Sequence, residues 1–474
     1  MTMLNRVLSA ALLSIIAGAA HGAGFAPCPD AATRPELNGS LCATERVPGD
    51  PAGASGGPAA DIALFIRKFP AMGASRGQAW LIAGGPGESG ASFYGLLPKL
   101  RESFPGFNLI VPDHRGTGLS TRMCPDEEAA GSTGGASLDG AEWGTCFASL
   151  NANPAYARQF SQTNAAHDLK LLLERLPARG KTYVYGVSYG TQLVLRTVAL
   201  GAANIDGVVL DSLVSLQDDD KADLSRRSLV ADAVGRQILA GCDASARCSA
   251  RMGAPVETIY RALLARADKD PALLAAVPGG NLKRFFGSLL DVPTAASQIP
   301  AMIKDLNEGR ADTVKAVLAD VERQMAPLGG FPQTPPSIPL VIVISGAENN
   351  LQPGRTVEEV RKEEAGLLFT SSLPGDLVGA PLPLYARDAW FARLPEKLPP
   401  TLVIHGDRDG KTPHDAAVRH IAALRKAGPV QLHTAREGGH FVLWSDNSCA
   451  RHTVAKFVLG SQLKTGCVSV ASSH

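Results

Sequence analysis

The sequence lacks an excess of charge of either sign. Its 474 residues carry a formal net charge of +1, so no strong electrostatic attraction draws the chain towards nucleic acids or acidic membranes. It also lacks a basic stripe, an internal repeat and a phosphate-binding loop of the form G-x-x-x-x-G-K. Hydrophobic residues make up 45% and charged residues 19%, which is typical of a globular protein. Nucleic acid is therefore not an expected partner.

Beyond its N-terminus the sequence lacks any apolar run long enough to span a bilayer. The N-terminal run from Val7 to Ala20 follows Arg6 and leads into small residues. This pattern indicates a secretory signal peptide over residues 1–23, and an uncleaved membrane anchor is the alternative. We therefore expect a secreted or periplasmic protein without stable membrane insertion.

The eight cysteines lack the C-x-x-C spacing and the Cys/His spacing that is typical of zinc sites. An even number of cysteines in an exported protein indicates disulfides. The cysteines fall into four neighbouring pairs, and joining neighbours predicts Cys28–Cys42, Cys124–Cys146, Cys242–Cys248 and Cys449–Cys467. No metal ion and no organic cofactor is expected.

Continuous apolar strands alternate with helical patterns in two separated parts of the chain. Such strands predict a mostly parallel, doubly wound sheet that is covered on both faces. The expected strands are 60–67, 78–83, 107–112, 181–185, 207–211, 401–405 and 430–433, and helices are expected at 165–176 and from 191 onwards.

Between these two parts the pattern changes to a helical one. Residues 216–330 are mostly helical in character, 331–339 are proline-rich and indicate a linker, and 355–395 are again helical and loop-like. The sheet is thus interrupted by a helical lid. The expected organisation is a signal peptide at 1–23, a first core part at 24–215, a cap at 216–395 and a second core part at 396–474.

The segment Gly186-Val187-Ser188-Tyr189-Gly190 reads G-x-S-x-G between an expected strand and an expected helix. Such a sharp turn needs small flanking residues and holds its central residue in a strained conformation. The strain lifts the Ser188 hydroxyl out of the sheet edge towards a substrate. The motif alone is common, and an ordinary strand-end turn is the alternative. It predicts Ser188 as a nucleophile.

A serine nucleophile needs a base, and the base needs a carboxylate that orients it. On this kind of sheet the order along the chain is serine, acid, histidine. His440 lies in a glycine-flanked loop after the last expected strand. From that loop its side chain can reach across the strand ends, so His440 is the expected base.

Three aspartates compete for the role of the acid. Asp407 and Asp409 share the turn 406–413, which reads G-D-R-D-G-K-T-P after an expected strand. The G-x-x-D-x-x-T-P arrangement favours Asp409, whereas Asp407 is expected to hydrogen-bond within the turn. Asp211, at the end of an earlier strand, is the third candidate.

A transition-state oxyanion needs backbone N–H donors. One donor is expected from Tyr189, directly after the nucleophile. The other is expected from the loop Gly84-Gly85-Pro86-Gly87, in which Pro86 has no N–H. We therefore expect Gly85 to donate, and the Gly85–Pro86 bond to be cis.

Four motifs in this order resemble one family. The chain is similar to the proline iminopeptidase and tripeptidyl aminopeptidase group of α/β-hydrolases over about residues 60–215 and 395–470. The resemblance implies a secreted serine exopeptidase that removes residues from peptide N-termini, with Ser188, Asp409 and His440 as its triad. The motifs are 84–87, 113–120, 186–190 and 406–413.

The sequence departs from this family at two positions. His114 stands where glutamine is usual, and Glu88 stands where glycine is usual. Members of the family hold the α-amine of the substrate with carboxylates from the lid, because an ammonium in a partly dry pocket needs an opposite charge. Glu348, within Ser345-Gly346-Ala347-Glu348-Asn349-Asn350, resembles such a lid motif. Glu88 is the second candidate, and an ordinary surface carboxylate is the alternative for both.

These patterns favour an aminopeptidase acting on peptides with a free N-terminus. A carboxylesterase with the same triad is the alternative, because a fold does not determine a substrate. A non-catalytic binding protein on a hydrolase fold is a third hypothesis. The sequence leaves the oligomeric state and the side-chain preference open.

Overall fold

The computed structural model describes residues 24–53, 61–129, 131–133, 141–379, 382–445, 447–461 and 467–468. The predicted signal peptide at 1–23 lies outside the described residues. Within the described ranges, no helix combines the length and the apolar character needed to cross a membrane.

The apolar segments of the sequence form a ten-stranded sheet in the order β1-β2-β3-β5-β4-β6-β7-β8-β9-β10. From β5 to β10 neighbouring strands run parallel, and the pairs from β1 to β5 are antiparallel. The expected mostly parallel sheet is confirmed. The strands are β1 (Ala26–Pro27), β2 (Leu41–Pro48), β3 (Asp61–Phe69), β4 (Gly77–Ile82), β5 (Asn108–Pro112), β6 (Lys181–Val187), β7 (Gly207–Asp211), β8 (Thr401–Gly406), β9 (Val430–Arg436) and β10 (Cys467–Val468).

Helices cover both faces of this sheet, which is why its central strands are apolar throughout. On β6, Tyr183 and Tyr185 join a hydrophobic cluster with α1 and α17, whereas Val184 joins the cluster with α4, α5 and α16 on the other face. The covering helices are α1 (Leu97–Ser103), α4 (Gln162–Arg175), α5 (Tyr189–Ala199), α16 (His414–Leu424) and α17 (Ser448–Val458), with α2 (Ala141–Ala152) and α3 (Pro154–Arg158) preceding α4.

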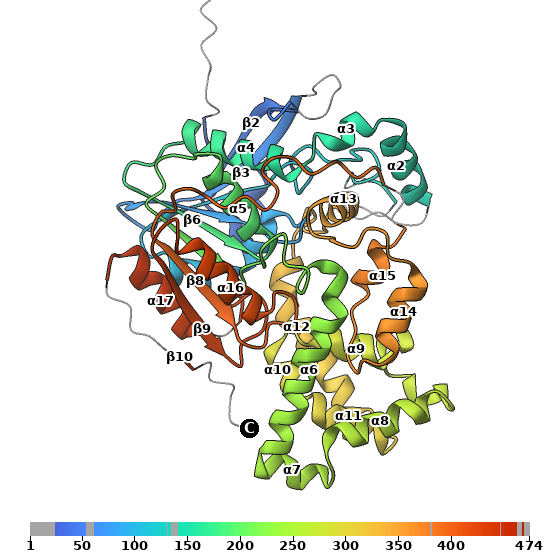
Figure 1. Ribbon diagram of the computed structural model, residues 1–474. Coiled ribbons are helices and arrows are strands. Elements are labelled where there is room, and N and C mark those ends of the chain that lie inside the picture. Colours follow the sequence, from blue (N-terminus) through green and yellow to red (C-terminus); the bar gives the residue numbers. More distant parts are fainter. Residues whose placement is uncertain are drawn as a thin grey trace, which may run out of the picture.

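The middle of the chain forms a second, helical body beside the sheet (Figure 1). Its aromatic interior includes Tyr260, whose ring centroid lies 5.4 Å from that of Phe286. This interior is continuous with the cluster on the α1 face of the sheet. The helices are α6 (Arg227–Ala244), α7 (Ala246–Met252), α8 (Val256–Ala267), α9 (Leu282–Leu289), α10 (Pro293–Ser297), α11 (Ile299–Asn307), α12 (Asp312–Gly329), α14 (Val357–Ala365) and α15 (Leu373–Leu377).

One helix of this middle region returns to the sheet. Helix α13 (Ile338–Glu348) begins inside the segment expected to be a linker, and in Figure 1 it lies near α2 and α3 rather than within the helical body. Its Leu340, Val343 and Ile344 join the cluster of α4 and α5. The boundaries proposed for the cap, 216 and 395, stay a prediction.

Three of the four predicted disulfides are present, namely Cys28–Cys42, Cys124–Cys146 and Cys242–Cys248. Cys449 is also disulfide-bonded. The side chain of Cys467, its expected partner, lies outside the described residues. These bonds are those expected of a protein in an oxidising compartment.

Strands β1, β2 and β10 were not predicted from the sequence. In β2 the exposed Thr44 and Arg46 alternate with the buried Ala43, Glu45 and Val47. The buried charge of Glu45 masks the apolar alternation, while β1 and β10 are two residues each and too short to give a pattern.

Candidate active site

Ser188 occupies a strained turn between β6 and α5. Its backbone has φ 54° and ψ −126°, a region that costs a non-glycine residue free energy. The flanking glycines permit the turn, because a Cβ at Gly186 would lie 2.5 Å from the carbonyl oxygen of Gly190. A Cβ at Gly190 would lie 2.5 Å from that of Ile82. The strand–turn–helix geometry that the motif predicts is therefore present.

The loop after β4 runs beside this turn. A Cβ built at Gly84 would lie 3.1 Å from the Cβ of Ser188, and the Gly85–Pro86 bond is cis, as expected. Tyr189 is the first residue of α5, so its N–H has no acceptor within the helix. The loop and the helix start thus bring Gly85 and Tyr189 to the pocket that Ser188 also lines. Their role as oxyanion donors stays a prediction.

Asp113, from the loop after β5, holds the end of the β4 loop in place. Its buried carboxylate accepts hydrogen bonds from the Ser89 hydroxyl at 2.9 Å and from the Gly90 N–H at 2.7 Å. It also accepts one from the Leu119 N–H at 2.8 Å. Burial raises the pKa of Asp113. The motif 113–120 therefore supports the loop that approaches Ser188.

His114 packs against the residue after the expected nucleophile. Its ring centroid lies 5.9 Å from that of Tyr189. Its Nδ1 is paired with the carbonyl oxygen of Arg115 at 2.9 Å, and its Nε2 is buried without a partner among the described residues. Burial lowers the pKa of His114 to about 4, so the ring is neutral at pH 7.

The structure brings Asp409 and His440 together. His440 Nδ1 lies 2.9 Å and 3.0 Å from the two carboxylate oxygens of Asp409. The same carboxylate accepts from the backbone N–H groups of Lys411 and Thr412 and from the Thr412 hydroxyl, each at 2.8 Å. This arrangement fixes the ring so that Nε2 is the nitrogen left for a reacting group. His440 and Ser188 line one pocket.

Opposing effects act on the Asp409 carboxyl. Burial disfavours its ionised form, but the charge of His440 and the hydrogen bonds that it accepts outweigh burial and hold its pKa well below the usual range. Asp409 is therefore an anion at pH 7, as a residue that orients a histidine and balances its charge must be.

The two other candidate acids have different partners. Asp407 accepts the Glu437 N–H at 2.5 Å, so it ties its turn to the loop of His440. Asp211 accepts the N–H groups of Val442 at 2.8 Å and Leu443 at 2.9 Å, and burial raises its pKa to about 6. Neither has a hydrogen bond to His440 among the described residues, so the geometry favours Asp409.

Glu348 requires a correction. Its carboxylate is buried, with a residue exposure of 2%, and accepts Arg196 at 2.9 and 3.0 Å. Gln217 at 2.9 Å and the Tyr385 hydroxyl at 3.0 Å also donate to it. It does not line either pocket that Ser188 lines. Both oxygens of Glu348 are thus occupied within the protein, and the expectation that it binds the substrate amine is not supported.

Glu88 lies where it was expected. One of its carboxylate oxygens is 3.2 Å from the position of a Cβ built at Gly84. Glu88 also lines a pocket with Ser188 and His440. Because the side chain is exposed, a charge there is well solvated and acts weakly on a ligand.

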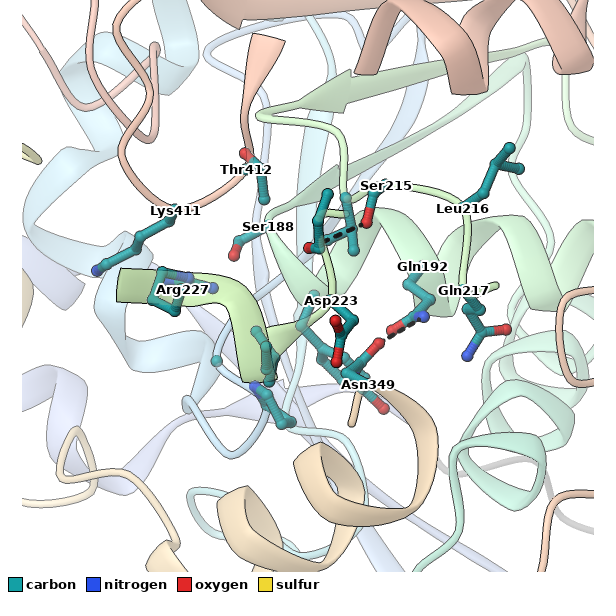
Figure 2. Close-up of a pocket in the computed structure, with 16 residues that line it drawn as sticks. Ser188, Gln192, Ser215, Leu216, Gln217, Asp223, Arg227, Asn349, Lys411 and Thr412 are labelled. Carbon is teal, nitrogen blue, oxygen red and sulfur yellow. Dashed lines mark hydrogen bonds between the residues drawn. The ribbon is translucent and has the colours of Figure 1, made fainter. Parts of the chain in front are cut away.

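The polar residues in the walls of the pocket were not predicted from the sequence. Figure 2 shows Asp223, Asn349 and Gln192 to the right of Ser188, and Arg227 and Lys411 to its left. Asp223 ends an acidic run, 218–223, that starts soon after β7, and Lys411 lies two residues after Asp409. Proximity to the triad motifs is the signal that could have identified both.

One carboxylate oxygen of Asp223 has no hydrogen-bond partner among the described residues. Its residue exposure is 6%, and its Oδ2 accepts the N–H groups of Leu351 at 2.8 Å and Ser225 at 3.2 Å. Its Oδ1 is buried without a hydrogen-bond partner among the described residues. A buried acceptor without a partner is uncommon, and here it belongs to a residue of the pocket wall.

Two protein families match the sequence. A family described as "alpha/beta hydrolase fold" matches residues 81–234, and one described as "TAP-like protein" matches residues 383–468. Comparison with curated proteins gives no match.

Among solved structures, proline iminopeptidase from Mycobacterium smegmatis is similar at 15% identity, with a TM-score of 0.43, over 88% of this chain and 98% of that chain. A thermophilic esterase from Thermogutta terrifontis is similar at 14% identity, with a TM-score of 0.35, over 88% and 98%. These similarities are too remote to support an assignment. The fold is therefore assigned from the sheet topology and from the two family matches. On these grounds the chain has an α/β-hydrolase fold, and its residues 383–468 match the TAP-like family.

Proposed function

We propose that the protein is an exported serine aminopeptidase, which releases residues or short peptides from peptide N-termini through an acyl-enzyme on Ser188. The observation that carries the proposal is the open oxygen of Asp223 in the pocket beside Ser188. The TAP-like match of residues 383–468 supports it. The disulfides Cys28–Cys42 and Cys124–Cys146 support export.

The arrangement of Asp409 and His440 supports this chemistry. His440 Nε2 takes the proton from the Ser188 hydroxyl as Oγ bonds to the scissile carbonyl carbon. The N–H groups of Gly85 and Tyr189 then stabilise the oxyanion. His440 passes its proton to the nitrogen of the leaving amine as the C–N bond breaks. In the second half-reaction His440 takes a proton from water, and the water oxygen bonds to the acyl carbon. The ester bond to Ser188 then breaks, and His440 returns the proton to Ser188 Oγ.

Asp223 would hold the α-amine of the substrate. A substrate ammonium that enters the pocket loses water, so it needs a negative acceptor in return. The Oδ1 atom of Asp223 is such an acceptor, since both backbone donors of this carboxylate reach Oδ2. Because Asp223 and Ser188 line the same pocket, an amine held by Asp223 would restrict cleavage to the first residues of a peptide.

A panel of fluorogenic amides of one, two and three residues tests the proposal, each with a free and with an acetylated N-terminus. We expect cleavage of free peptides only. Asp223→Asn should lower kcat/KM for them by about 10- to 100-fold, the effect of one charge-assisted hydrogen bond. Asp220→Asn is the control, because Asp220 is exposed and lines neither pocket of Ser188, so it should change kcat/KM less than about threefold.

Other results would contradict the proposal in different ways. Equal rates on free and acetylated amides, or faster cleavage of short-chain esters, would indicate a carboxylesterase with the same triad. Equal labelling of the wild type and Ser188→Ala by a fluorophosphonate would show that Ser188 is not the nucleophile. Absence of any labelling or hydrolysis would indicate a binding protein on a hydrolase fold.

A further inference from the structure

Two hollows meet at Ser188. One is lined by Asp223, Asn349 and Gln192, the other by His440 and Glu88, and Lys411 lines both. Arg227 borders both, and in Figure 2 it lies on the side of Ser188 opposite to Asp223. A scissile bond at Ser188 would therefore have the carboxylate of Asp223 on one side and the cations of Arg227 and Lys411 on the other.

His440 identifies the side that receives the leaving part of the substrate. In the proposed reaction its Nε2 gives a proton to the leaving amine, so the amine must lie beside the ring. His440 lines the hollow of Glu88, which Arg227 also lines, and is not among the residues that line the hollow of Asp223. The acyl part with its ammonium then lies towards Asp223, and the leaving part lies towards Arg227.

Arg227 has a charge that no described residue neutralises directly. It is half-buried, and its guanidinium takes part in no hydrogen bond or ion pair with the described part of the chain. Of the two carboxylates near enough to act on it, Asp291 is paired with Lys411 at 2.8 Å and Asp409 with His440 at 2.9 Å. Burial lowers the pKa of Arg227, yet a guanidinium stays protonated in proteins.

The position of Arg227 in its helix adds to this excess of positive charge. Arg227 is the first residue of the 18-residue helix α6, which continues from the 3₁₀ turn Leu224–Arg226, and its N–H donates to the carbonyl oxygen of Leu224. The partial positive charge of the helix start lies near this turn. It adds to the charge of the guanidinium, so the surroundings of Arg227 favour an anionic ligand.

Arg227 and Lys411 also line a further cavity of about 440 Å³. Arg227, Arg284 and Lys411 supply three cations to its wall, and Asp291 supplies one carboxylate. Glu88 is the opposing charge nearer to Ser188. On the leaving side, the region farther from the scissile bond therefore has more cationic than anionic side chains.

We propose that Arg227 binds a carboxylate on the leaving part of the peptide. This inference rests on the proposed aminopeptidase function and specifies its substrates. The carboxylate is either the C-terminus of a short peptide or an acidic side chain close to the cleaved bond, since both present the same two oxygens to a guanidinium. Short peptides and peptides with an acidic leaving part are then cleaved in preference to neutral, C-terminally blocked ones.

Three peptide substrates that share one acyl part separate the two sources. The first ends in a free carboxylate, the second is its C-terminal amide, and the third is the amide with aspartate as the first leaving residue. A p-nitroanilide with the same acyl part has a neutral leaving group and serves as the reference. We expect the two carboxylate-bearing peptides, or one of them, to exceed the plain amide in kcat/KM by about tenfold or more.

The variant Arg227→Gln should remove this preference. The expected result is a loss of about tenfold or more in kcat/KM on carboxylate-bearing peptides, mainly through KM, with the p-nitroanilide changed less than about threefold. Arg226→Gln is the matched control, because Arg226 is paired with Glu363 at 3.0 Å and lines neither hollow. If Arg227→Gln does not fold, Arg227→Lys and the salt dependence of KM give the same information, since added salt should raise KM for the charged peptides alone.

The outcomes separate this inference from the function on which it rests. Equal rates on all three peptides, with the free N-terminus still required, would overturn the role of Arg227 and leave the aminopeptidase intact. Cleavage of none of them, together with cleavage of esters, would overturn both. A loss on the p-nitroanilide as large as on the peptides would show that Arg227 acts through Asp409 and not on the leaving part.

Discussion

The loops at the ends of the strands and the walls of the pocket differ in how far their polar groups are satisfied. Asp409, with five contacts from His440, Lys411 and Thr412, has a donor for each oxygen. In the walls, by contrast, Asp223 keeps an open Oδ1 and Arg227 has no direct partner among the described residues.

This difference separates positioning from recognition. A residue that orients another must be held by its own hydrogen bonds, so its donors and acceptors are paired within the protein. A residue that binds a substrate must keep a donor or acceptor free for the ligand, which costs free energy when the ligand is absent. Unpaired polar atoms in the walls of a pocket therefore indicate substrate contacts better than charge alone does. Glu348 illustrates this, because it is charged but fully paired.

The largest expected effect tests the strand-end loops. Asp409→Asn should lower kcat by about 10⁴-fold, because an amide cannot hold the same histidine tautomer or balance its charge. Asp407→Asn is the matched control in the same turn. Its amide oxygen can still accept the Glu437 N–H, so kcat should fall less than about tenfold. Equal effects of the two variants on kcat would remove the distinction between these aspartates.

A second prediction compares the fully hydrogen-bonded carboxylate of Glu348 with that of Asp223, whose Oδ1 has no partner among the described residues. Glu348→Gln should lower the free energy of unfolding by about 3 kcal/mol, because it leaves the buried Arg196 without its counter-charge. It should leave the preference for a free N-terminus unchanged. Asp223→Asn should reduce the preference for a free N-terminus and leave the free energy of unfolding nearly unchanged. Chemical denaturation measures the stability of both variants, and the amide panel measures their preference. A loss of amine preference in Glu348→Gln would show that Glu348 does bind the amine.

The smallest effect concerns the dependence of stability on pH. Burial opposes the ionisation of Asp409, but His440 and the Thr412 donors lower its pKa below that of the unfolded chain. Its ionised form thus stabilises the fold above about pH 4, and this contribution is lost as the pH falls. Between pH 5 and pH 3 the wild type should lose about 1 kcal/mol more stability than Asp409→Asn. An identical loss in both proteins would contradict the lowered pKa.

The strand-end groups could be predicted because their causes are local in the sequence. Gly186 and Gly190 each approach another backbone too closely for a Cβ, so the motif itself encodes the turn at Ser188. Asp409 and His440 each follow a strand, and parallel strands bring their C-terminal ends to one edge. The order of the motifs was therefore enough to place them together.

The polar groups of the pocket walls could not be predicted, because their hydrogen-bond partners are far away in the sequence. Asp223 is held by the backbone of Leu351, 128 residues away. Glu348 was chosen for its local motif, but its partner Arg196 lies 152 residues away on α5. Which carboxylate keeps an open oxygen is decided by such long-range pairs, and no local pattern reports them.

The left-handed backbone at Ser188 also sets a limit on what selection for stability can do at this position. Glycine would relieve the strain of φ 54°, and alanine would keep it. The most stable residue at position 188 is thus one that has no hydroxyl at all. The hydroxyl persists against a folding preference of about 1 kcal/mol or more, so a more stable chain is one mutation away and would have lost its chemistry.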